Sequence, residues 1–593
     1  MTRPDLALLL AIALSLGPQF AASQAVLDVV GGDEDLSQAL GAASVLMRER
    51  EAATPTSDTV AAARAEYSRL LSVLYAEGYF AGVISVRIDG REAAQMSPFT
   101  APGQIGEITI RVDPGPPFTL GAAQIGPLAP GDLAADSFAT GAPASTGVLR
   151  EAAGSAIDAW RDAGHATADV SDQTIRAQNR TATLDATIQI DPGPILQFGD
   201  LVPTGQDRMP ASRVTEIAGL PGGALFSPAE LSRAADRLRR TGVFSSVALR
   251  EGAVRSDGRI DIDAELVEAP LRRLGFGAEL SSTEGLALSG YWLHRNLTGG
   301  GERLRFDVEI IGIGQDAGQP DANIGVSFSR PATATPDTTF QAELGASYVD
   351  DDTFQELVVE GQAGVEQQIT DELTGSAALG FRFSDISDNF GDRQVTLVTL
   401  PSGLTYDTRN NTLDASSGIY ASLDLVPFFV TDSSEFGARA AADIRGYLGF
   451  GREDRTRLAG RLQFGTVTGG AITDLPPGYL FFSGGGGTVR GQDYRGLGAI
   501  QLGEASGGRS FLGLSGELRQ DVTDTIGLVA FYDSGYIAAD PIWDDSGTWH
   551  AGAGLGLRYA TPIGAIRLDL AAPVSGPDPD SDFFVYIGIG QAF

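Results

Sequence analysis

Apolar and polar residues alternate along much of the second half of the chain. In residues 304–310 every second side chain is apolar, and the intervening ones are charged. The same period of two returns in residues 458–464, 512–519 and 566–570. This period predicts β-strands that each have one apolar face and one polar face.

The repeated pairing of an apolar face with a charged face favours a membrane barrel over a sandwich. A sandwich packs its two sheets together, which leaves no place for charges along the inner side of strand after strand. A barrel with lipid outside and a polar lumen inside requires this arrangement. From residue 269 to residue 593, at roughly 20 residues per strand with its turn, the sequence predicts about 16 antiparallel strands.

Both ends of the predicted barrel can be located. The first strand is expected at residues 274–281, and the last segment places Val585, Ile587, Ile589 and Phe593 on one side. An alternating apolar strand that stops on an aromatic residue resembles the terminal strand of bacterial outer-membrane barrels. The closing strand of any other sheet can show the same pattern.

The first half of the chain contains repeats with a helical period. Asp-Pro-Gly-Pro occurs at 113–116 and again at 191–194, each time between two predicted strands. Gly78, Gly164 and Gly242 each follow a helical segment and precede a strand, which is the usual position of a left-handed helix cap.

Each repeat predicts one strand, two helices and two further strands, a small α+β module of ordinary domain size. The predicted domains are three α+β modules at residues 26–115, 116–193 and 194–268, followed by an all-β transmembrane barrel at 269–593.

The first residues have the pattern of a secretory signal. Arg3 precedes an apolar run from Leu6 to Leu16, and small residues follow at 21–25. Because the run is too short to span a bilayer, we expect residues 1–25 to be a signal peptide. An exported chain without cysteine is compatible with the bacterial periplasm or outer membrane.

Composition argues against several classes of function. The chain has 42 basic and 76 acidic residues and a formal net charge of -34, which would repel a phosphate backbone. We therefore expect no nucleic-acid partner. Every basic residue is arginine, which excludes a P-loop lysine and Schiff-base chemistry.

The sequence predicts neither an enzyme nor a metal site. His165, His294 and His550 are far apart, and there is no cysteine, so no metal-ligand spacing is present. Neither Gly-x-Ser-x-Gly nor His-Glu-x-x-His occurs, and few residues remain as a general base. We expect no catalytic residues, no metal and no cofactor.

A glycine-rich segment, FFSGGGGTVRGQDYRGLG, covers residues 481–498. It is interpretable as a phosphate cradle or as a loop folded back into a pore. The segment lacks lysine, lies among predicted strands and leads into no obvious helix, which argues against phosphate binding. The favoured interpretation is a loop that enters the barrel.

Five segments carry a family resemblance. They are NLTGGGERLRF (296–306), TYDTRNNTLDASSGIYASLDL (405–425), TVRGQDYRG (488–496), SGELRQDV (515–522) and FYDSG (531–535). Together they resemble the Omp85 superfamily, in which periplasmic POTRA domains precede a barrel whose Val-Arg-Gly loop folds into the lumen. The resemblance covers essentially all of the chain after the signal peptide.

The resemblance implies two sets of site residues. The loop tip comprises Val489, Arg490, Gly491 and Tyr494. The facing barrel wall comprises Glu517, Phe531, Asp533 and Gly535. The chain departs from the family at Gln492, where Phe or Tyr usually follows Val-Arg-Gly, which leaves open which side chain covers the arginine.

An arginine in a barrel lumen needs a carboxylate, because an unpaired buried charge is strongly destabilising. By strand parity Glu517 and Asp533 point away from the apolar face and into the lumen. We expect Arg490 to pair with one or both, and the glycines at 484–487 to admit backbone where a Cβ would clash. The alternative is that Arg490 is a loop residue exposed to water.

The resemblance also implies a function, namely assembly of other proteins into the bacterial outer membrane. The expected partners are outer-membrane lipid, unfolded clients such as autotransporters, and an inner-membrane-anchored protein at the first POTRA module in the periplasm. Clients would enter at a lateral seam between the first and last strands, where Gly588 and Gly590 weaken the last strand and Phe593 ends it. The rival interpretation is a two-partner secretion transporter or pore that passes clients through the lumen.

Overall fold

The computed structural model describes residues 24–48, 55–133, 135–282, 285–314, 319–542, 546–561, 565–576 and 583–589. The chain divides into two compact units. One contains the residues up to Asp200 with Pro221–Glu230 and Glu251–Asp261, and the other contains Leu201–Leu220, Leu231–Arg250 and Ile262–Phe593. Among the described residues, no helix combines the length and the apolar character needed to cross a membrane.

The first module is a four-stranded sheet in the order β1-β4-β2-β3, with helices packed on it. Its elements are β1 (Gln24–Val29), α1 (Glu34–Ala43), α2 (Val45–Arg48), α3 (Thr56–Ala76), β2 (Val83–Ile88), β3 (Arg91–Glu92) and β4 (Glu107–Asp113). Leu70 and Leu74 of α3 share one core cluster with Ile110 of β4. The first strand begins at Gln24 and Ala25 is buried, so the last two residues of the expected 1–25 segment are part of this module.

The second module has a three-stranded sheet in the order β5-β7-β6. Its elements are β5 (Thr119–Gly126), α4 (Thr146–Asp162), β6 (Asp169–Gln178) and β7 (Thr183–Asp191). The prediction of two helices is wrong here, because the described residues of this module contain one α-helix. The segment 127–145 contains Pro127, Pro130, Gly131 and Pro143, which interrupt helical hydrogen bonding, and its described residues form turns instead.

The third module follows the predicted order of one strand, two helices and two strands. Its elements are β8 (Gln197–Thr204), α5 (Ala211–Ala218), α6 (Pro228–Arg240), β9 (Phe244–Val254) and β10 (Arg259–Glu268), and the sheet order is β8-β10-β9. The predicted helix caps are confirmed in all three modules, since Gly78, Gly164 and Gly242 have φ of +88°, +95° and +66°.

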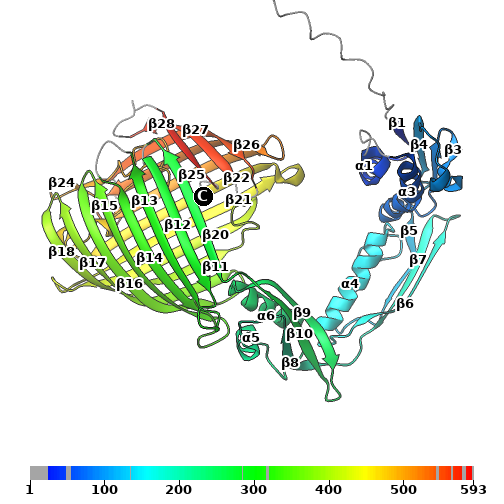
Figure 1. Cartoon of the computed structure of the whole chain (residues 1–593), viewed down its shortest axis with the longest axis horizontal. Helices are drawn as coiled ribbons and strands as arrows, with labels where there is room; N and C mark the ends of the chain where they lie inside the picture. The colour runs from blue at the N-terminus through cyan, green and yellow to red at the C-terminus, as the bar shows by residue number, and fades with distance from the viewer. Residues whose placement is uncertain are drawn as a thin grey trace, which may run out of the picture. The chain divides into compact units, whose positions relative to one another are not determined.

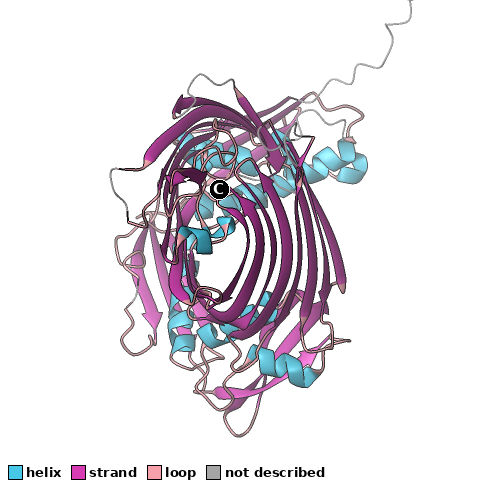
Figure 2. Cartoon of the chain, turned by 90° about the vertical axis from the view of Figure 1, so that its left-hand side faces the viewer, coloured by secondary structure: helices cyan, strands magenta, loops and turns pink. Residues whose placement is uncertain are grey.

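The second half of the chain forms a closed antiparallel barrel. Its strands are β11 (Arg272–Ser281), β12 (Gly285–Arg295), β13 (Arg303–Ile313), β14 (Asp321–Arg330), β15 (Thr338–Asp351), β16 (Phe354–Gln368), β17 (Leu373–Asp388), β18 (Gly391–Thr399), β19 (Ser402–Asp407), β20 (Ser417–Val430), β21 (Glu435–Phe450), β22 (Thr456–Gly469), β25 (Ser510–Asp521), β26 (Ile526–Ala538), β27 (Thr548–Tyr559), β28 (Ile566–Ser575) and β29 (Phe584–Ile589). Figure 1 shows them in sequence colours from green to red, and Figure 2 shows them curving around a lumen.

Two of these segments are halves of a single strand. β18 and β19 both pair with β17 and with β20, and Leu400 and Pro401 separate them. Proline has no N–H to donate to a strand ladder, which accounts for the interruption. Counted as one strand, they give a closed barrel of 16 antiparallel strands, as predicted.

The alternating pattern sorts side chains between the two faces of the barrel wall. Phe276, Phe306 and Val308 are exposed on the outer face, with Phe276 87% exposed. Apolar exposure on strand after strand indicates a surface that contacts lipid. Charged residues such as Arg305 and Asp307 alternate with them and face the lumen, where they form an ion pair.

Arg213 of α5 and Arg237 of α6 belong to the same compact unit as the barrel and are bonded to its turns. Arg213 of α5 donates through Nε to the carbonyl oxygen of Gly300 at 2.8 Å, in the turn between β12 and β13. Arg237 of α6 donates through Nε and Nη2 to the two carboxylate oxygens of Asp337, at 2.8 and 2.7 Å. This bidentate contact fixes α6 to the turn between β14 and β15.

Candidate functional site

The glycine-rich loop connects β22 to β25 and enters the barrel lumen. It contains the short 3-10 helices η4 (Ile472–Asp474) and η5 (Pro477–Tyr479) and the hairpin of β23 (Ala499–Gln501) and β24 (Glu504–Ser506). The tip of the loop is buried at Val489, Arg490 and Gln492. Its partners are lumen-facing side chains and backbone carbonyl oxygens of β25 to β29, so the tip lies against the C-terminal wall of the barrel.

Arg490 is 3% exposed and is surrounded by three carboxylates. Its Nε donates to Oδ2 of Asp533 at 2.7 Å, and its Nη2 donates to Oδ1 of the same residue at 3.1 Å. Its Nη1 donates to Glu517 at 2.7 Å and to Asp569 at 3.3 Å. The backbone N–H of Arg490 also donates to Asp533 at 3.2 Å, so this aspartate holds both the side chain and the main chain of the loop tip.

Two further arginines complete the cluster. Arg519 donates through Nε to the second oxygen of Glu517 at 2.8 Å, and Arg558 donates to both oxygens of Asp569. The cluster therefore contains as many guanidinium groups as carboxylates. Because buried charges are tolerated only when paired and hydrogen-bonded, the neighbouring Arg519 and Arg558 are as necessary to the site as the residues that contact Arg490.

The ring that covers Arg490 is Phe531, whose centroid lies 3.6 Å from the guanidinium carbon. The ring of Tyr494 instead lies beside Arg495, whose guanidinium carbon is 4.9 Å from the ring centroid. Gln492, the departure from the family pattern, donates its side-chain amide to the carbonyl oxygens of Ala551 at 2.7 Å and Ser575 at 3.0 Å. An amide at this position thus binds backbone of β27 and β28.

Glycines allow the loop and the wall to approach closely. A Cβ added at Gly552 of β27 would lie 1.9 Å from the carbonyl oxygen of Arg490, and one added at Gly535 would lie 2.4 Å from Oγ of Ser483. Gly484 has φ of +115°, and a Cβ there would lie 2.0 Å from the carbonyl oxygen of Asp493. Gly487, in contrast, has open space around it, so the glycine run is sterically required at its first position and not at its last.

The opposite wall of the barrel holds an earlier part of the same loop. The backbone N–H of Gly478 donates to Oε2 of Glu356 at 2.9 Å, and Arg382 donates to the other oxygen of this buried glutamate at 2.9 Å. Arg439 donates to the carbonyl oxygen of Tyr479 at 3.2 Å. In the strand order of the barrel, β16 and β17 lie about halfway around from β26 to β28. The loop is therefore attached to both sides of the lumen.

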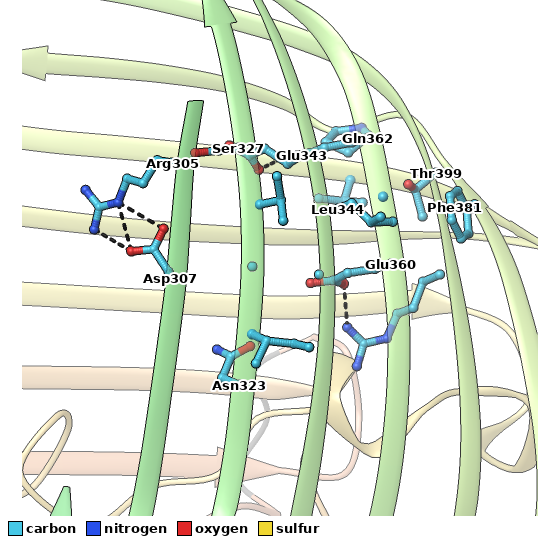
Figure 3. Close-up of a pocket in the computed structure, with 18 of the residues that line it drawn as sticks. Arg305, Asp307, Asn323, Ser327, Glu343, Leu344, Glu360, Gln362, Phe381 and Thr399 are labelled. Carbon is cyan, nitrogen blue, oxygen red and sulfur yellow. Dashed lines mark hydrogen bonds and ion pairs between the residues drawn. The ribbon is translucent and has the colours of Figure 1, made fainter. Parts of the chain in front are cut away.

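Beside this second attachment lies a cavity of about 590 Å³ against the inner face of β13 to β17. Figure 3 shows its polar wall, with the Arg305–Asp307 pair on one strand. Glu360 accepts a hydrogen bond from Arg382 at 3.0 Å, and Tyr479 of the loop also lines the space. The tip of the loop thus packs against the C-terminal side of the lumen, and this cavity lies along the N-terminal side.

In the part of the chain that the structure describes, the barrel closes between β11 and β29 over two registered pairs and one further backbone hydrogen bond, from the N–H of Ser282 to the carbonyl oxygen of Val585 at 3.0 Å. Among the described residues, the registered pairs are Leu280↔Ile587 and Ser281↔Tyr586, whereas β11 pairs with β12 along its whole length. The hydroxyl of Tyr586, which points into the lumen, accepts a hydrogen bond from the backbone N–H of Gly491 at 3.1 Å. The last described strand is therefore also bonded to the tip of the loop.

The structure brings most of the sequence-predicted residues together. Val489, Arg490, Glu517, Phe531, Asp533 and Gly535 form one buried group. Tyr494 lies on the same loop beside Arg495, and Gly588 lies on β29. Gly590 and Phe593 lie outside the described residues.

Sequence reasoning missed Asp569, Arg519, Arg558 and Tyr586. Asp569 alternates with apolar Leu568 and Leu570, so the parity argument that found Glu517 was available for it as well. Tyr586 lies opposite the apolar face of β29 by the same argument. What the sequence does not supply is the register that brings β28 and β29 to the same depth as β25 and β26.

The three histidines do not form a common site. His165 lies in the second module, where its Nδ1 is 2.8 Å from the carbonyl oxygen of Gly193, and His550 is 2.7 Å from Oγ of Ser483 in the barrel. Within the described ranges, no group of three or more His, Asp or Glu side chains has an arrangement that could hold a metal ion.

Fold and site together define a class of protein, a membrane barrel with a loop locked in its lumen and α+β modules before it. The model of the Omp85 superfamily domain matches residues 296–593, and the chain belongs to this superfamily. Among solved structures, it is similar to BamA from Haemophilus ducreyi lacking POTRA domains 1-3, with a TM-score of 0.59 and 17% identity over 80% of this chain and 100% of that one. It is also similar to CdiB from Acinetobacter baumannii, with a TM-score of 0.54 and 14% identity over 80% of this chain and 90% of that one.

Proposed function

We propose that the chain assembles autotransporters and other β-barrel proteins into the bacterial outer membrane, at the seam between β11 and β29. The observation that carries this proposal is that the registered pairing at the seam stops at Leu280↔Ile587, although the next residues of both strands, Glu279 and Gly588, are also described. An unpaired strand edge is costly in lipid and is a template for another strand. A client strand that pairs with the opened edge would remove this cost and lower the barrier to insertion.

In this proposal the Arg490 cluster holds the tip of the loop against the barrel wall. Asp533 and Glu517 hold the loop tip to β25 and β26, and Asp569 extends the attachment to β28. A seated loop keeps the C-terminal strands in one arrangement while the seam opens. No hydrolysable cofactor is needed, because folding of the client in lipid supplies the free energy.

We assign the α+β modules to three POTRA domains in the periplasm. β6 and β9 are edge strands of their sheets, and an edge strand can accept an extended client by β-augmentation. The general barrel-assembly protein usually carries five POTRA domains, and two-partner secretion transporters carry two. Three modules in a chain of this length are most like TamA, which implies a TamB-like, inner-membrane-anchored partner at the first domain.

A disulfide across the seam tests the site of insertion. Leu280 and Ile587 face each other in register, and the chain has no native cysteine, so Leu280→Cys with Ile587→Cys forms a single defined bond. We expect the oxidised variant to lose insertion of a purified autotransporter into lipid vesicles, and reduction to restore it. Insertion that proceeds unchanged in the oxidised form would contradict the proposal.

The matched control places the same bond away from the seam. Leu462 and Leu514 face each other between β22 and β25, and both are exposed on the outer face. Oxidation of cysteines at these positions should leave insertion unchanged. The rival function, transport through the lumen, predicts a large steady conductance in planar bilayers and activity that survives a locked seam.

A further inference from the structure

The seam contains a side-chain contact beside the Leu280↔Ile587 pair of its backbone ladder. Arg567 of β28 donates through Nη2 to Oε1 of Glu279 on β11. The next position after the Leu280↔Ile587 pair would set Glu279 opposite Gly588, but no pair is registered there. Among the described residues, an ion pair from β28 to β11 therefore lies next to the Leu280↔Ile587 pair, at a position where β11 and β29 have no registered backbone pair.

Gly588 leaves room for this contact. It is paired with Arg567 in the register of β28 and β29, and it lies on the lumen side of the strand. A Cβ added at Gly588 would lie 3.1 Å from Nε of Arg567 and 3.4 Å from the carboxyl group of Glu279. The absence of a side chain lets the arginine reach across the last strand to the first one.

We propose that Glu279 and Arg567 are positioning residues of the seam, which hold β11 against the C-terminal strands across Gly588. The pair joins two strands that are not neighbours in the ladder, so it must break before β11 separates from β29. Glu279 is partly exposed, with 44% of its side chain accessible, and so the contact is weak enough to be reversible. This inference specifies how the seam of the proposed function is held closed.

Hydrogen exchange of the purified protein in detergent, without any client, measures this directly. Glu279→Gln keeps the size of the side chain and removes its charge. We expect exchange of the amides in β11 and β29 to become about two- to fivefold faster, the range for one partly exposed ion pair. Peptides from β20 and β21 should exchange at the wild-type rate.

Reversal of the charges separates a specific contact from a general loss of structure. Glu279→Arg and Arg567→Glu should each increase exchange at the seam, and the double variant should return it toward the wild-type rate. Added salt should accelerate seam exchange in the wild type and have little effect in Glu279→Gln, because salt screens an ion pair that the variant lacks. The matched control is Glu360→Gln, which breaks a partly exposed lumen ion pair with Arg382 between β16 and β17 and should leave seam exchange unchanged.

Equal exchange in wild type and Glu279→Gln, or a double variant as fast as the single ones, would overturn the inference. The result is independent of the insertion assay. If the locked seam still inserts clients while Glu279→Gln accelerates exchange, the ion pair holds the seam and the proposed function is wrong. If locking stops insertion and exchange does not change, the proposed function stands without this pair.

Discussion

Removal of Arg490 should affect its three carboxylate partners unequally. In Arg490→Ala, Glu517 keeps its hydrogen bond from Arg519, and Asp569 keeps Arg558. Asp533 receives its side-chain hydrogen bonds from Arg490 alone among the described residues, and it is 1% exposed. The variant therefore leaves one buried carboxylate without a cation.

The loss of stability in Arg490→Ala follows from the unpaired charge of Asp533. Breaking a buried ion pair by removing one partner costs about 3–5 kcal/mol, largely because the remaining charge is desolvated and unpaired. Adding Asp533→Asn to Arg490→Ala removes this charge, so we expect roughly 1–3 kcal/mol of the loss to return. Adding Glu517→Gln instead should return less, since it deprives Arg519 of its carboxylate.

The assay is the free energy of unfolding in lipid vesicles, followed by the shift between folded and unfolded bands on unheated gels. Limited proteolysis of the loop gives a second readout of whether its tip is seated. The expected order of stability is wild type, Arg490→Ala with Asp533→Asn, then Arg490→Ala alone. Equal recovery from Asp533→Asn and Glu517→Gln would refute the assignment of Asp533 as the orphaned charge.

Two further predictions concern the ion pair between Arg237 and Asp337 and the packing of Gly552 against the tip of the loop. Hydrogen bonds from Arg237 hold the pKa of Asp337 below its ordinary value, so this contact contributes above a pH of about 3.9 and is lost as the pH falls through the lowered pKa. Hydrogen exchange in α6, corrected for its intrinsic pH dependence, should therefore rise only in strong acid, and Asp337→Asn should show the raised rate at neutral pH. Gly552→Ala should lower the free energy of unfolding by about 1–3 kcal/mol, because its methyl group would collide with the carbonyl oxygen of Arg490. The control Gly516→Ala, which has open space around it, should not change this free energy. Equal unfolding free energies for the two variants would contradict the prediction.

Much of the fold is predictable because its elements obey short-range rules. The period of two is sufficient to place Phe306 on the outer face and Arg305 on the inner face, and left-handed glycines end helices at Gly78, Gly164 and Gly242. Strand parity also places Glu517 and Asp533 in the lumen. The pairing of these acids with Arg490 then follows from the cost of a buried charge.

The remaining features depend on long-range register or on local breaks. Asp569 reaches Arg490 only because β28 lies at a particular depth relative to β25, and the lengths of several turns set that depth. The hydrogen bonds of Gln492 go to carbonyl oxygens, which every residue has, so no sequence pattern marks them. In the second module, Pro127, Pro130 and Pro143 prevent the helix that the repeat pattern predicts, because local breakers outweigh similarity between modules.

The hydrogen bond between Tyr586 and Gly491 depends on the register in which the last strand pairs. A slip of β29 by one residue exchanges its two faces, which would turn this phenol toward lipid and bring Val585 or Ile587 inward. The buried N–H of Gly491 would then face a side chain that cannot accept its proton. The hydrogen bond from Gly491 therefore forms only when the last strand is paired in the correct register. A barrel that closes in another register would lose this bond, and the tip of its loop would be less tightly held.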